Sequence, residues 1–559
     1  MSRRRVYLET FGCQMNELDS ELVAGQLRTL GYAFTPEAAD ADVVLYNTCS
    51  VREHAEQKVW SRLGELKEEK RRRPGLVVGV LGCLAEREGE DLVRRMPVVD
   101  VLCGPGELDK LPSLLDNAVR TRESLIADEP EDDRLRSARQ LALQGNTSRR
   151  SATLAAAGDS LELLDLSRST APASDEGPEK KSAYVRITRG CNKFCTYCVV
   201  PFTRGAEVHR PPQHIIDECK RLADAGVVEI TLLGQTVNHY RFEHGAAVTV
   251  GGVVQPQKGR SYQGGHRRDP FAGESVTTFA GLLARIHEEV PHLARLRFVT
   301  SYPRDFGDDV LEVIRDHHRI CRYLHVPAQS GSDRLLGLMN RGYSVGEYLE
   351  FLDRARAHLD RPEEGRPLMV SGDFIVGFPT ETEEDFAATV SLLEKSRYKN
   401  AFIFKYSPRP GTVAIGKFGD DVPEAVKRRR NNELLAAQGA MSSRIGAEQV
   451  GRRFDVMVEG LSVREQKRRR GPSCDAQGGV TLTVGGRVPS ACGGGVAHSE
   501  EDQAGAREST PQMSARTDSD MIVLFDLPAG EVPDAWVGRI VPVRITSATA
   551  LSLHATLQP

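Results

Sequence analysis

The sequence predicts an α/β protein of three parts: an N-terminal domain with a doubly wound parallel sheet, a central partial (βα)6 barrel and a small C-terminal β-barrel. Strand and helix patterns alternate over residues 1–120 and 182–415, which is typical of parallel sheets. Short strands with little helix follow from residue 451 and favour a small barrel. The 559 residues, with 40% hydrophobic side chains and a net charge of −4, exclude a disordered chain and a uniformly basic nucleic-acid-binding protein.

The N-terminal domain, residues 1–120, contains apolar strand patterns separated by amphipathic helices. Because parallel sheets are covered on both faces, we expect these strands to be buried. Residues 121–181 are predicted to be a linker, partly disordered, since the second half is rich in Ser, Ala, Thr, Asp and Glu and lacks apolar periodicity. The strand patterns are 5–11, 41–46, 75–81 and 98–102, and the helix patterns are 18–30 and 52–72.

Six strand patterns and five helix patterns alternate between residues 182 and 415 and predict an open or partial barrel. The stretch 242–273, rich in Gly, Gln and Arg, interrupts them and is predicted to be an inserted loop. A connecting helix is predicted over residues 416–450. The strand patterns are 183–188, 229–233, 296–300, 323–326, 370–376 and 401–406, and the helix patterns are 213–224, 278–290, 306–317, 344–358 and 383–395.

The C-terminal domain, residues 451–559, shows the alternation of half-buried strands at 452–459, 521–525 and 538–545. Between these strands, residues 464–508 are low in complexity and are predicted to be a second insertion.

The chain contains eleven cysteines. Its basic first residues are not followed by an apolar segment, and no run approaches 18 apolar residues. We therefore expect a cytoplasmic protein without membrane attachment, whose cysteines are thiols rather than disulfides.

Three cysteines, Cys191, Cys195 and Cys198, lie on the loop that follows the first predicted barrel strand. We call them the loop triad. Three thiolates can hold three irons of a [4Fe–4S] cluster and leave the fourth iron open. A zinc site is the alternative, but zinc normally takes four protein ligands, and no fourth Cys or His is close in the sequence.

A second set, Cys13, Cys49 and Cys83, follows three predicted strands of the N-terminal domain. We call it the sheet-edge triad. The carboxyl ends of parallel strands share one edge of a sheet, so these thiols are expected to converge on a second cluster. Three unrelated buried thiols are the alternative, and Cys103, which ends the fourth strand, fits the same geometry. Structural or incidental roles are predicted for Cys219, Cys321, Cys474 and Cys492.

The motifs around these cysteines resemble the methylthiotransferase family of the radical S-adenosylmethionine (SAM) superfamily, and most closely its MiaB-type tRNA 2-methylthio-adenosine synthases. The resemblance covers all three domains and leaves out the linker and the two insertions. Within the family, Cys13–Asn16 favours the branch that acts on tRNA. The motifs are Thr10–Asn16, Asn47–Glu53, Cys191–Gly205, Leu232–Gln235, Gln329–Ser332, Phe374–Pro379 and Tyr406–Thr412.

The resemblance implies two [4Fe–4S] clusters, one on each triad, with SAM as radical source and methyl donor. It implies conversion of N6-(dimethylallyl)adenosine to its 2-methylthio derivative next to the anticodon of tRNA, and a TRAM-like RNA-binding C-terminal barrel. The same chemistry on N6-threonylcarbamoyladenosine is the first alternative, and a non-catalytic metal-containing RNA-binding protein is the second. We expect a monomer, and the sequence identifies neither electron donor nor sulfur source.

Contacts with SAM are predicted at the carboxyl ends of the barrel strands. No side chain is predicted to act as a catalytic acid, base or nucleophile, because an aromatic C–H is not acidic enough for one. The predicted SAM contacts are Tyr197, Gly234, Gln235, Ser301 and Gln329.

Residues 424–470 carry 12 Lys and Arg against 6 Asp and Glu. The basic runs Lys427–Arg430 and Lys467–Arg470 are therefore candidates for contacts with RNA phosphates. A solvated helix face or a flexible tail is the alternative for each run. Thr236 and His209 depart from the family pattern, which usually has Asn and Ser there.

Overall fold

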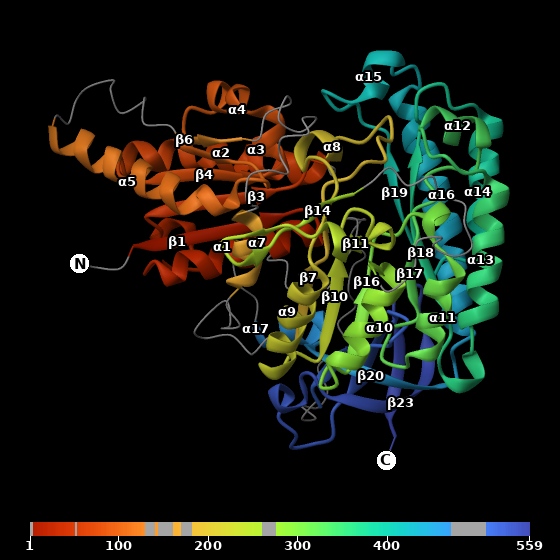
Figure 1. Ribbon diagram of the computed structural model, residues 1–559. Coiled ribbons are helices and arrows are strands. Elements are labelled where there is room, and N and C mark those ends of the chain that lie inside the picture. The colour runs from red at the N-terminus through yellow and green to blue at the C-terminus, as the bar shows by residue number, and fades with distance from the viewer. Residues whose placement is uncertain are drawn as a thin grey trace, which may run out of the picture.

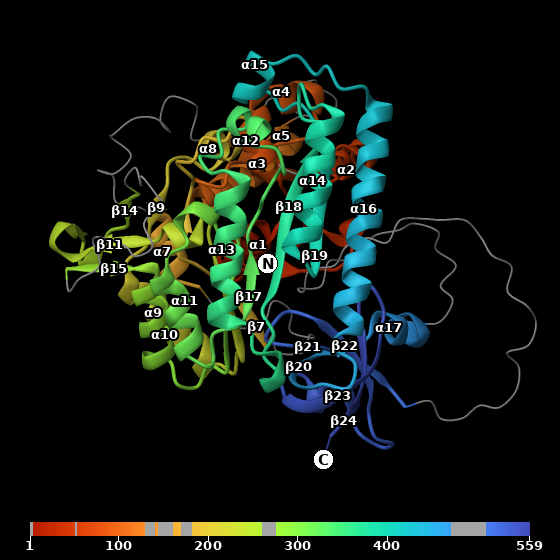
Figure 2. The ribbon, with the colours of Figure 1, turned by 90° about the vertical axis from the view of Figure 1, so that its right-hand side faces the viewer.

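The computed structural model describes residues 4–50, 53–128, 140–143, 160–168, 181–259, 275–470 and 510–558. The predicted fold class is confirmed, with the three parts in the predicted order (Figure 1). The N-terminal domain lies beside the partial barrel, and the C-terminal barrel lies at the opposite end of the partial barrel from the loop after β7 (Figures 1 and 2).

The N-terminal sheet has six parallel strands in the order β2-β1-β3-β4-β5-β6. Alternate residues of each strand enter the hydrophobic clusters on the two faces, so the sheet is doubly wound, as predicted. Helices α1 (Gln14–Thr29) and α5 (Leu111–Asp128) pack on one face, and α2 (Glu53–Arg72), α3 (Cys83–Glu88) and α4 (Glu90–Arg95) on the other. The strands are β1 (Arg5–Phe11), β2 (Ala33–Phe34), β3 (Val43–Thr48), β4 (Val77–Gly82), β5 (Val101–Cys103) and β6 (Gln140–Ala142).

The predicted linker contains structure that its composition did not indicate. Helix α5 continues to Asp128, and β6 adds the sixth strand to the sheet by pairing with β5. Helix α7 (Ser160–Leu166) packs against the N-terminal domain and β7. Both β6 and α7 are too short to show a periodic pattern. Helix α7 is anchored by the buried carboxylates of Glu162 and Asp165 as well as by Leu161 and Leu164, which pack into the core.

The central domain has six parallel strands in two groups, β16-β10-β7 and β17-β18-β19. A parallel bridge between Leu296 and Ile320 joins the groups, and β7 and β19 are the two edge strands, so the barrel is partial, as predicted. The strands are β7 (Ser182–Arg186), β10 (Glu229–Leu233), β16 (Arg295–Phe298), β17 (Tyr323–His325), β18 (Met369–Val376) and β19 (Asn400–Lys405).

Amphipathic helices cover the outside of this barrel and bury its main hydrophobic core (Figure 2). The predicted connecting helix is α16 (Glu424–Ala447), which packs along β19 and α14. The other helices are α8 (Val200–Thr203), α9 (Pro212–Asp224), α10 (Phe279–Glu289), α11 (Asp308–Asp316), α12 (Asp333–Leu338), α13 (Val345–Leu359), α14 (Glu383–Ser396) and α15 (Val413–Lys417).

The insertion predicted at 242–273 forms short antiparallel strands rather than a plain loop in its described part. Strand β11 (Arg241–Glu243) pairs with β15 (Val276–Thr278), and β14 (Gln257–Lys258) pairs with β9 (Val208–His209), which also pairs with β8 (Thr188–Arg189). Strands β12 (Thr249–Val250) and β13 (Val253–Val254) form a hairpin. Strands of two or three residues carry no detectable periodicity, and residues 260–274 lie outside the described part.

The C-terminal strands close into a barrel in the order β20-β21-β22-β24-β23 (Figure 2). Most of the predicted second insertion, 471–508, lies outside the described residues, and its start forms helix α17 (Val463–Arg470). Within the described residues, no helix is long and apolar enough to cross a membrane. The strands are β20 (Arg453–Leu461), β21 (Gln512–Arg516), β22 (Ile522–Asp526), β23 (Ile540–Ala548) and β24 (Leu553–Leu557).

Candidate active site

The loop triad lies at the carboxyl end of β7, between the N-terminal domain and the barrel (Figure 1). The loop is anchored on the end of α12, because Thr196 donates from its backbone N to Met339 O at 3.1 Å and from Oγ1 to Leu338 O at 2.9 Å. The backbone N of Cys198 donates to Cys195 O at 3.0 Å, which curls the end of the loop back on itself. The fold therefore holds the three cysteines on one small, fixed loop.

Arg341 is a buried cation beside the loop triad that the sequence reasoning missed. Its Nη1 lies 3.4 Å from Cys195 Sγ and 3.5 Å from the Tyr197 hydroxyl, and its Nη2 donates to Pro327 O at 3.1 Å. Burial raises the pKa of the Cys191 thiol to about 12 and that of Cys198 further. Thiolates in such a site need positive charge nearby, and Arg341 supplies part of it.

The sheet-edge triad converges as its strand positions predicted. Cys13 precedes α1 after β1, Cys49 follows β3, and Cys83 begins α3 after β4, and these three strands are neighbours in the sheet. Gly12 has a φ of +136°, and a Cβ there would lie 2.4 Å from Cys49 Cβ. Only glycine permits this approach, so Gly12 brings Cys13 and Cys49 together.

Two buried asparagines fasten the loops that carry this triad. Asn16 Nδ2 donates to Asn47 Oδ1 at 2.9 Å, and Asn47 Nδ2 returns a bond of 2.9 Å to Asn16 O. Asn16 Oδ1 also accepts from Cys13 Sγ at 3.1 Å. Their part in aligning the first two strand ends could not be predicted without the sheet order.

The sulfurs of each triad are not gathered within 4.8 Å of one another in the described residues. Donor sulfurs around a tetrahedral zinc ion lie about 3.8 Å apart, given a Zn–S distance of about 2.3 Å. Among the described residues, the group of three or more His, Cys, Asp or Glu ligand atoms within 4.8 Å of one another is Glu207, His209 and His239, and it contains no cysteine. Each triad thus has the three thiols that a [4Fe–4S] cluster with one open iron requires, and the identity of the bound metal stays a prediction.

The two triads are joined by one short segment of chain, residues 198–204, which includes α8. At its end, Arg204 is buried and donates to Asp19 Oδ2 on α1 at 2.9 Å. Burial opposes its charge, but Cys83, Asp19 and Cys13 raise the pKa of Arg204 further above its usual value. Arg204 of the central domain therefore faces the thiols of Cys13 and Cys83 in the N-terminal domain.

Helix α7 completes this interface with buried carboxylates. Asp165 accepts from Arg186 at 2.7 and 3.3 Å, and Arg186 also donates to Asp19 at 3.0 Å. Glu162 accepts from Arg210 Nε at 3.0 Å. A segment predicted to be linker thus neutralises buried arginines of the central domain.

The predicted SAM contacts all lie at the carboxyl ends of barrel strands. Gly234 follows β10, where a Cβ would lie 2.1 Å from Thr188 Oγ1, so no side chain fits at this position. Thr188 Oγ1 and Ser301 Oγ are buried and have no hydrogen-bond partner among the described residues. Gln329 has a φ of +70°, and its backbone N donates to Asp373 O at 2.8 Å.

Tyr197 is half-buried beside Arg341, and Gln235 is half-buried after β10. Unpaired buried hydroxyls at strand ends fit a polar ligand. The five residues are suitably placed, and their contacts with SAM stay predictions.

The remaining described cysteines are structural. Cys103 Sγ donates to Glu107 O at 3.1 Å and packs in the N-terminal core, so its alternative role as a cluster ligand is not favoured. Cys219 and Cys321 are buried, the first of them in the core of the barrel. Cys474 and Cys492 lie outside the described residues.

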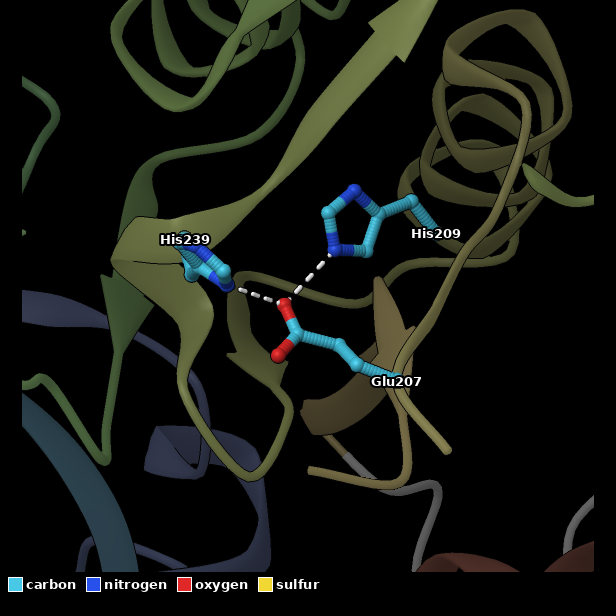
Figure 3. A group of neighbouring side chains, drawn as sticks. All are labelled: Glu207, His209 and His239. Carbon is cyan, nitrogen blue, oxygen red and sulfur yellow. Dashed lines mark hydrogen bonds and ion pairs between the residues drawn. The ribbon is translucent and has the colours of Figure 1, made fainter. Parts of the chain in front are cut away.

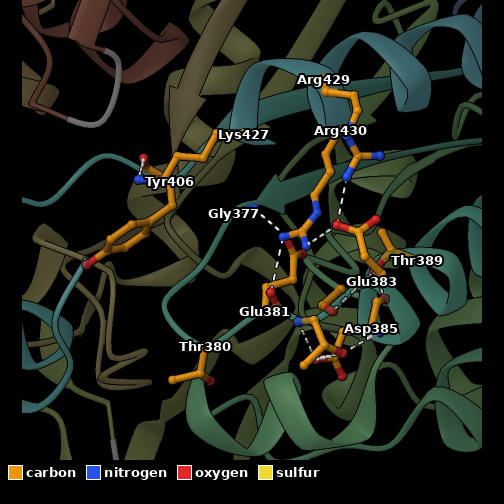
Figure 4. A network of polar contacts seen from close by, with 12 residues as sticks. Gly377, Thr380, Glu381, Glu383, Asp385, Thr389, Tyr406, Lys427, Arg429 and Arg430 are labelled. Carbon is orange, nitrogen blue, oxygen red and sulfur yellow. Dashed lines mark hydrogen bonds and ion pairs between the residues drawn. The ribbon is translucent and has the colours of Figure 1, made fainter. Parts of the chain in front are cut away.

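The first basic run, on α16, is part of a structural network rather than a free phosphate-binding surface (Figure 4). Lys427 is buried and pairs with Asp420 at 2.5 Å. Arg430 is buried and pairs with Glu381 at 2.7 Å, while Arg429 pairs with a carboxylate of α14 at 2.7 Å. The prediction of phosphate-binding cations is therefore wrong for the buried Lys427 and Arg430, whereas Arg429 is about half exposed and stays a candidate.

The second basic run lies on α17. Arg468 and Arg469 both bond to the buried Glu465, at 2.7 and 3.0 Å, and both remain about half exposed. Glu465 therefore orients these cations on an accessible helix, and the run stays a candidate for RNA phosphates.

Comparisons with known proteins give the class of this molecule. Residues 5–104 match the uncharacterized protein family UPF0004, and residues 185–393 match the radical SAM superfamily. Together with the cysteine loop after the first barrel strand, the second match defines a radical SAM enzyme.

Similar proteins with known names identify the family within the radical SAM class. A tRNA-2-methylthio-N(6)-dimethylallyladenosine synthase of Rhodopirellula baltica is 43% identical over 83% of this chain and 85% of its own. One from Dichelobacter nodosus is 36% identical over 99% of this chain and 96% of its own. The chain belongs to the tRNA-2-methylthio-N(6)-dimethylallyladenosine synthase family. A solved radical SAM methyltransferase from Kitasatospora setae aligns with 14% identity and a TM-score of 0.45 over 72% of this chain and 73% of that one.

Proposed function

We propose that this protein converts N6-(dimethylallyl)adenosine of tRNA to 2-methylthio-N6-(dimethylallyl)adenosine, using SAM and two [4Fe–4S] clusters. The observation that carries the proposal is the pair of separate cysteine triads, each at the carboxyl edge of its own parallel sheet, in a chain of this family. A reaction that bonds a sulfur to carbon C2 of adenine and a methyl group to that sulfur has a use for two centres.

The loop triad would hold the cluster that binds SAM, and the sheet-edge triad would hold the auxiliary cluster. When bound, these groups supply the one-electron and sulfur chemistry that activates an aromatic C–H bond, which no protein side chain can do. The chain's own residues bind, orient and shield them.

Arg341 and Arg204 would each place a positive charge beside one triad. Arg341 lies 3.4 Å from Cys195 Sγ, and Arg204 faces Cys13 and Cys83. Both guanidiniums are buried, so their charge acts on the neighbouring sulfurs with little screening by water. They are positioning residues in the reaction that we propose.

The buried hydroxyls of Thr188 and Ser301 would receive polar groups of SAM, and Gly234, which has no side chain, lets the strand end approach Thr188 closely. A buried hydroxyl without a partner is destabilising, and a bound ligand would satisfy it. Tyr197, Gln235 and Gln329 lie at neighbouring strand ends and would complete the pocket.

The C-terminal barrel and α17 would bind the tRNA. The half-exposed Arg468 and Arg469 support this assignment, because cations on a helix can neutralise backbone phosphates. The target adenosine must leave its stack to reach a buried site, as is general for enzymes that modify bases. We expect the protein to work as a cytoplasmic monomer.

The test compares two substrates. The reconstituted enzyme is incubated anaerobically with SAM, a reductant and tRNA that carries either N6-(dimethylallyl)adenosine or N6-threonylcarbamoyladenosine. We expect mass spectrometry of the nucleosides to find a methylthio product from the first tRNA alone. Product from the second tRNA alone would move the assignment to the threonylcarbamoyl branch, and no SAM cleavage with either tRNA would favour a non-catalytic RNA-binding protein.

A further inference from the structure

A buried group of two histidines and one glutamate lies beside the loop triad and is not used in the proposed reaction (Figure 3). Glu207 and His209 come from the segment that ends in β9, and His239 comes from the short 3-10 helix Val237–His239 after β10. Glu207 Oε1 lies 2.7 Å from His209 Nε2 and 2.5 Å from His239 Nδ1. All three side chains are more than nine-tenths buried.

Glu207 has one oxygen to spare. Its Oε2 is buried and has no hydrogen-bond partner among the described residues. A buried carboxylate oxygen without a partner is destabilising, and a bound cation would satisfy it.

His209 is oriented like a metal ligand. Its Nδ1 lies 2.6 Å from Arg241 O, to which it can donate, and 3.0 Å from Arg241 N. With the proton on Nδ1, the other ring nitrogen, Nε2, faces Glu207 Oε1 at 2.7 Å, where either a proton or a metal cation can lie between the two atoms. Metal-bound histidines commonly donate their second ring nitrogen to a backbone carbonyl in this way.

We propose that Glu207, His209 and His239 form a binding site for a divalent zinc ion that is separate from both cysteine triads. Glu207 would bind through both oxygens and each histidine through one nitrogen, which gives the four N and O donors that zinc takes in closed sites. Donor atoms around zinc lie about 3.4 Å apart, so the present contacts open by less than about 1 Å as zinc replaces the protons between them.

The insertion after β10 covers this site. Strand β14 pairs with β9, and the next residue, Gly259, donates from its backbone N to Glu207 O at 2.9 Å. A Cβ at Gly259 would lie 3.0 Å from His209 Nε2, so the backbone closes the site. Asn192 of the cluster loop donates to Gly259 O at 3.1 Å and accepts from Glu207 N at 3.0 Å. Zinc would thus lie next to the contact between the insertion and the cluster loop.

The test measures zinc in the reconstituted holoenzyme. Protein that carries both clusters is stripped with a chelating resin, given one equivalent of Zn²⁺, desalted and analysed for zinc and iron. We expect about one zinc per chain in the wild type and in His292→Ser, which removes an exposed histidine elsewhere. We expect at least an approximately fivefold loss of zinc in His209→Ser and in the isosteric Glu207→Gln, with iron unchanged.

X-ray absorption at the zinc edge gives an answer that does not depend on any variant. We expect nitrogen and oxygen neighbours at about 2.0–2.2 Å and no sulfur neighbours. Sulfur at about 2.3 Å would mean that zinc occupies a cysteine triad and would overturn the proposal. A wild type that retains no zinc, or variants that retain as much as the wild type, would overturn it equally.

Discussion

Replacing Asp165 by asparagine tests whether α7 is a structural part of the interface between the N-terminal and central domains. Asp165 is buried and accepts two bonds from Arg186, at 2.7 and 3.3 Å. Burial would raise the pKa of this carboxyl, but Arg186 and Arg210 outweigh burial and lower it. The carboxylate therefore carries a full charge whose partners are buried with it.

The expected loss of stability depends on the hydrogen bonds that the asparagine side chain can still make. Breaking a buried ion pair typically costs about 3–5 kcal/mol. The asparagine side chain in Asp165→Asn would retain one acceptor oxygen, and Arg186 would keep its bond of 3.0 Å to Asp19, so we expect the lower end, about 3 kcal/mol. If this energy opposes the local opening of α7, the opening equilibrium shifts roughly 150-fold, since about 1.4 kcal/mol corresponds to a factor of ten.

Amide hydrogen exchange of the peptide 160–168 measures that opening directly. We expect exchange in Asp165→Asn to be roughly 100-fold faster than in the wild type. The matched control is Asp116→Asn, which removes an exposed pair with Arg120 that is worth less than about 1 kcal/mol. If both variants exchange alike at 160–168, the buried pair does not hold α7, and the interface argument fails.

Three further perturbations address the sheet-edge triad and the outer surface. Gly12→Ala places a Cβ 2.4 Å from that of Cys49 at a φ of +136°, which should prevent the sheet-edge triad from holding its cluster. The iron content after reconstitution should then fall from about eight to about four atoms per chain, and a content of about eight would contradict the close approach. Arg204→Gln removes a buried cation, so the auxiliary cluster should be reduced at a more negative potential in potentiometric titration with EPR detection; an unchanged potential would rule out the charge effect. Burial and the nearby charge of Arg319 lower the pKa of His287 to about 4, so the unfolded chain binds the extra proton as the pH falls from 6.5 to 4. In His287→Gln, Tm should decrease less than in the wild type as the pH is lowered over this range. Equal slopes of Tm against pH for the two proteins would refute the assignment to His287.

The sequence predicted the elements that have strong periodicity and the positions of cysteines that follow from strand order. The sheet-edge triad is one example, because each cysteine ends a strand and β1, β3 and β4 are neighbours. The loop triad is another, because its spacing lies within one loop.

The rest depends on contacts between distant segments. Arg341 contacts Cys195, which lies 146 residues earlier in the sequence. Asp165 on α7 pairs with Arg186 on β7, which lies beyond residues that the structure does not describe. Neither shows any local signal. Lys427 and Arg430 on α16 failed as phosphate sites because their partners, Asp420 and Glu381, lie on the loops before α16 and α14, where sequence alone cannot place them.

The most direct test of the account separates the roles of the two triads. We assign SAM cleavage to the loop triad and sulfur insertion to the sheet-edge triad. One alanine substitution in each triad should therefore remove different activities. Reconstituted Cys195→Ala and Cys49→Ala are compared for cleavage of SAM and for methylthio product on tRNA that carries N6-(dimethylallyl)adenosine. We predict that Cys195→Ala loses both, while Cys49→Ala still cleaves SAM but forms no product. Methylthio product from Cys49→Ala would contradict the assignment of a second, sulfur-supplying cluster.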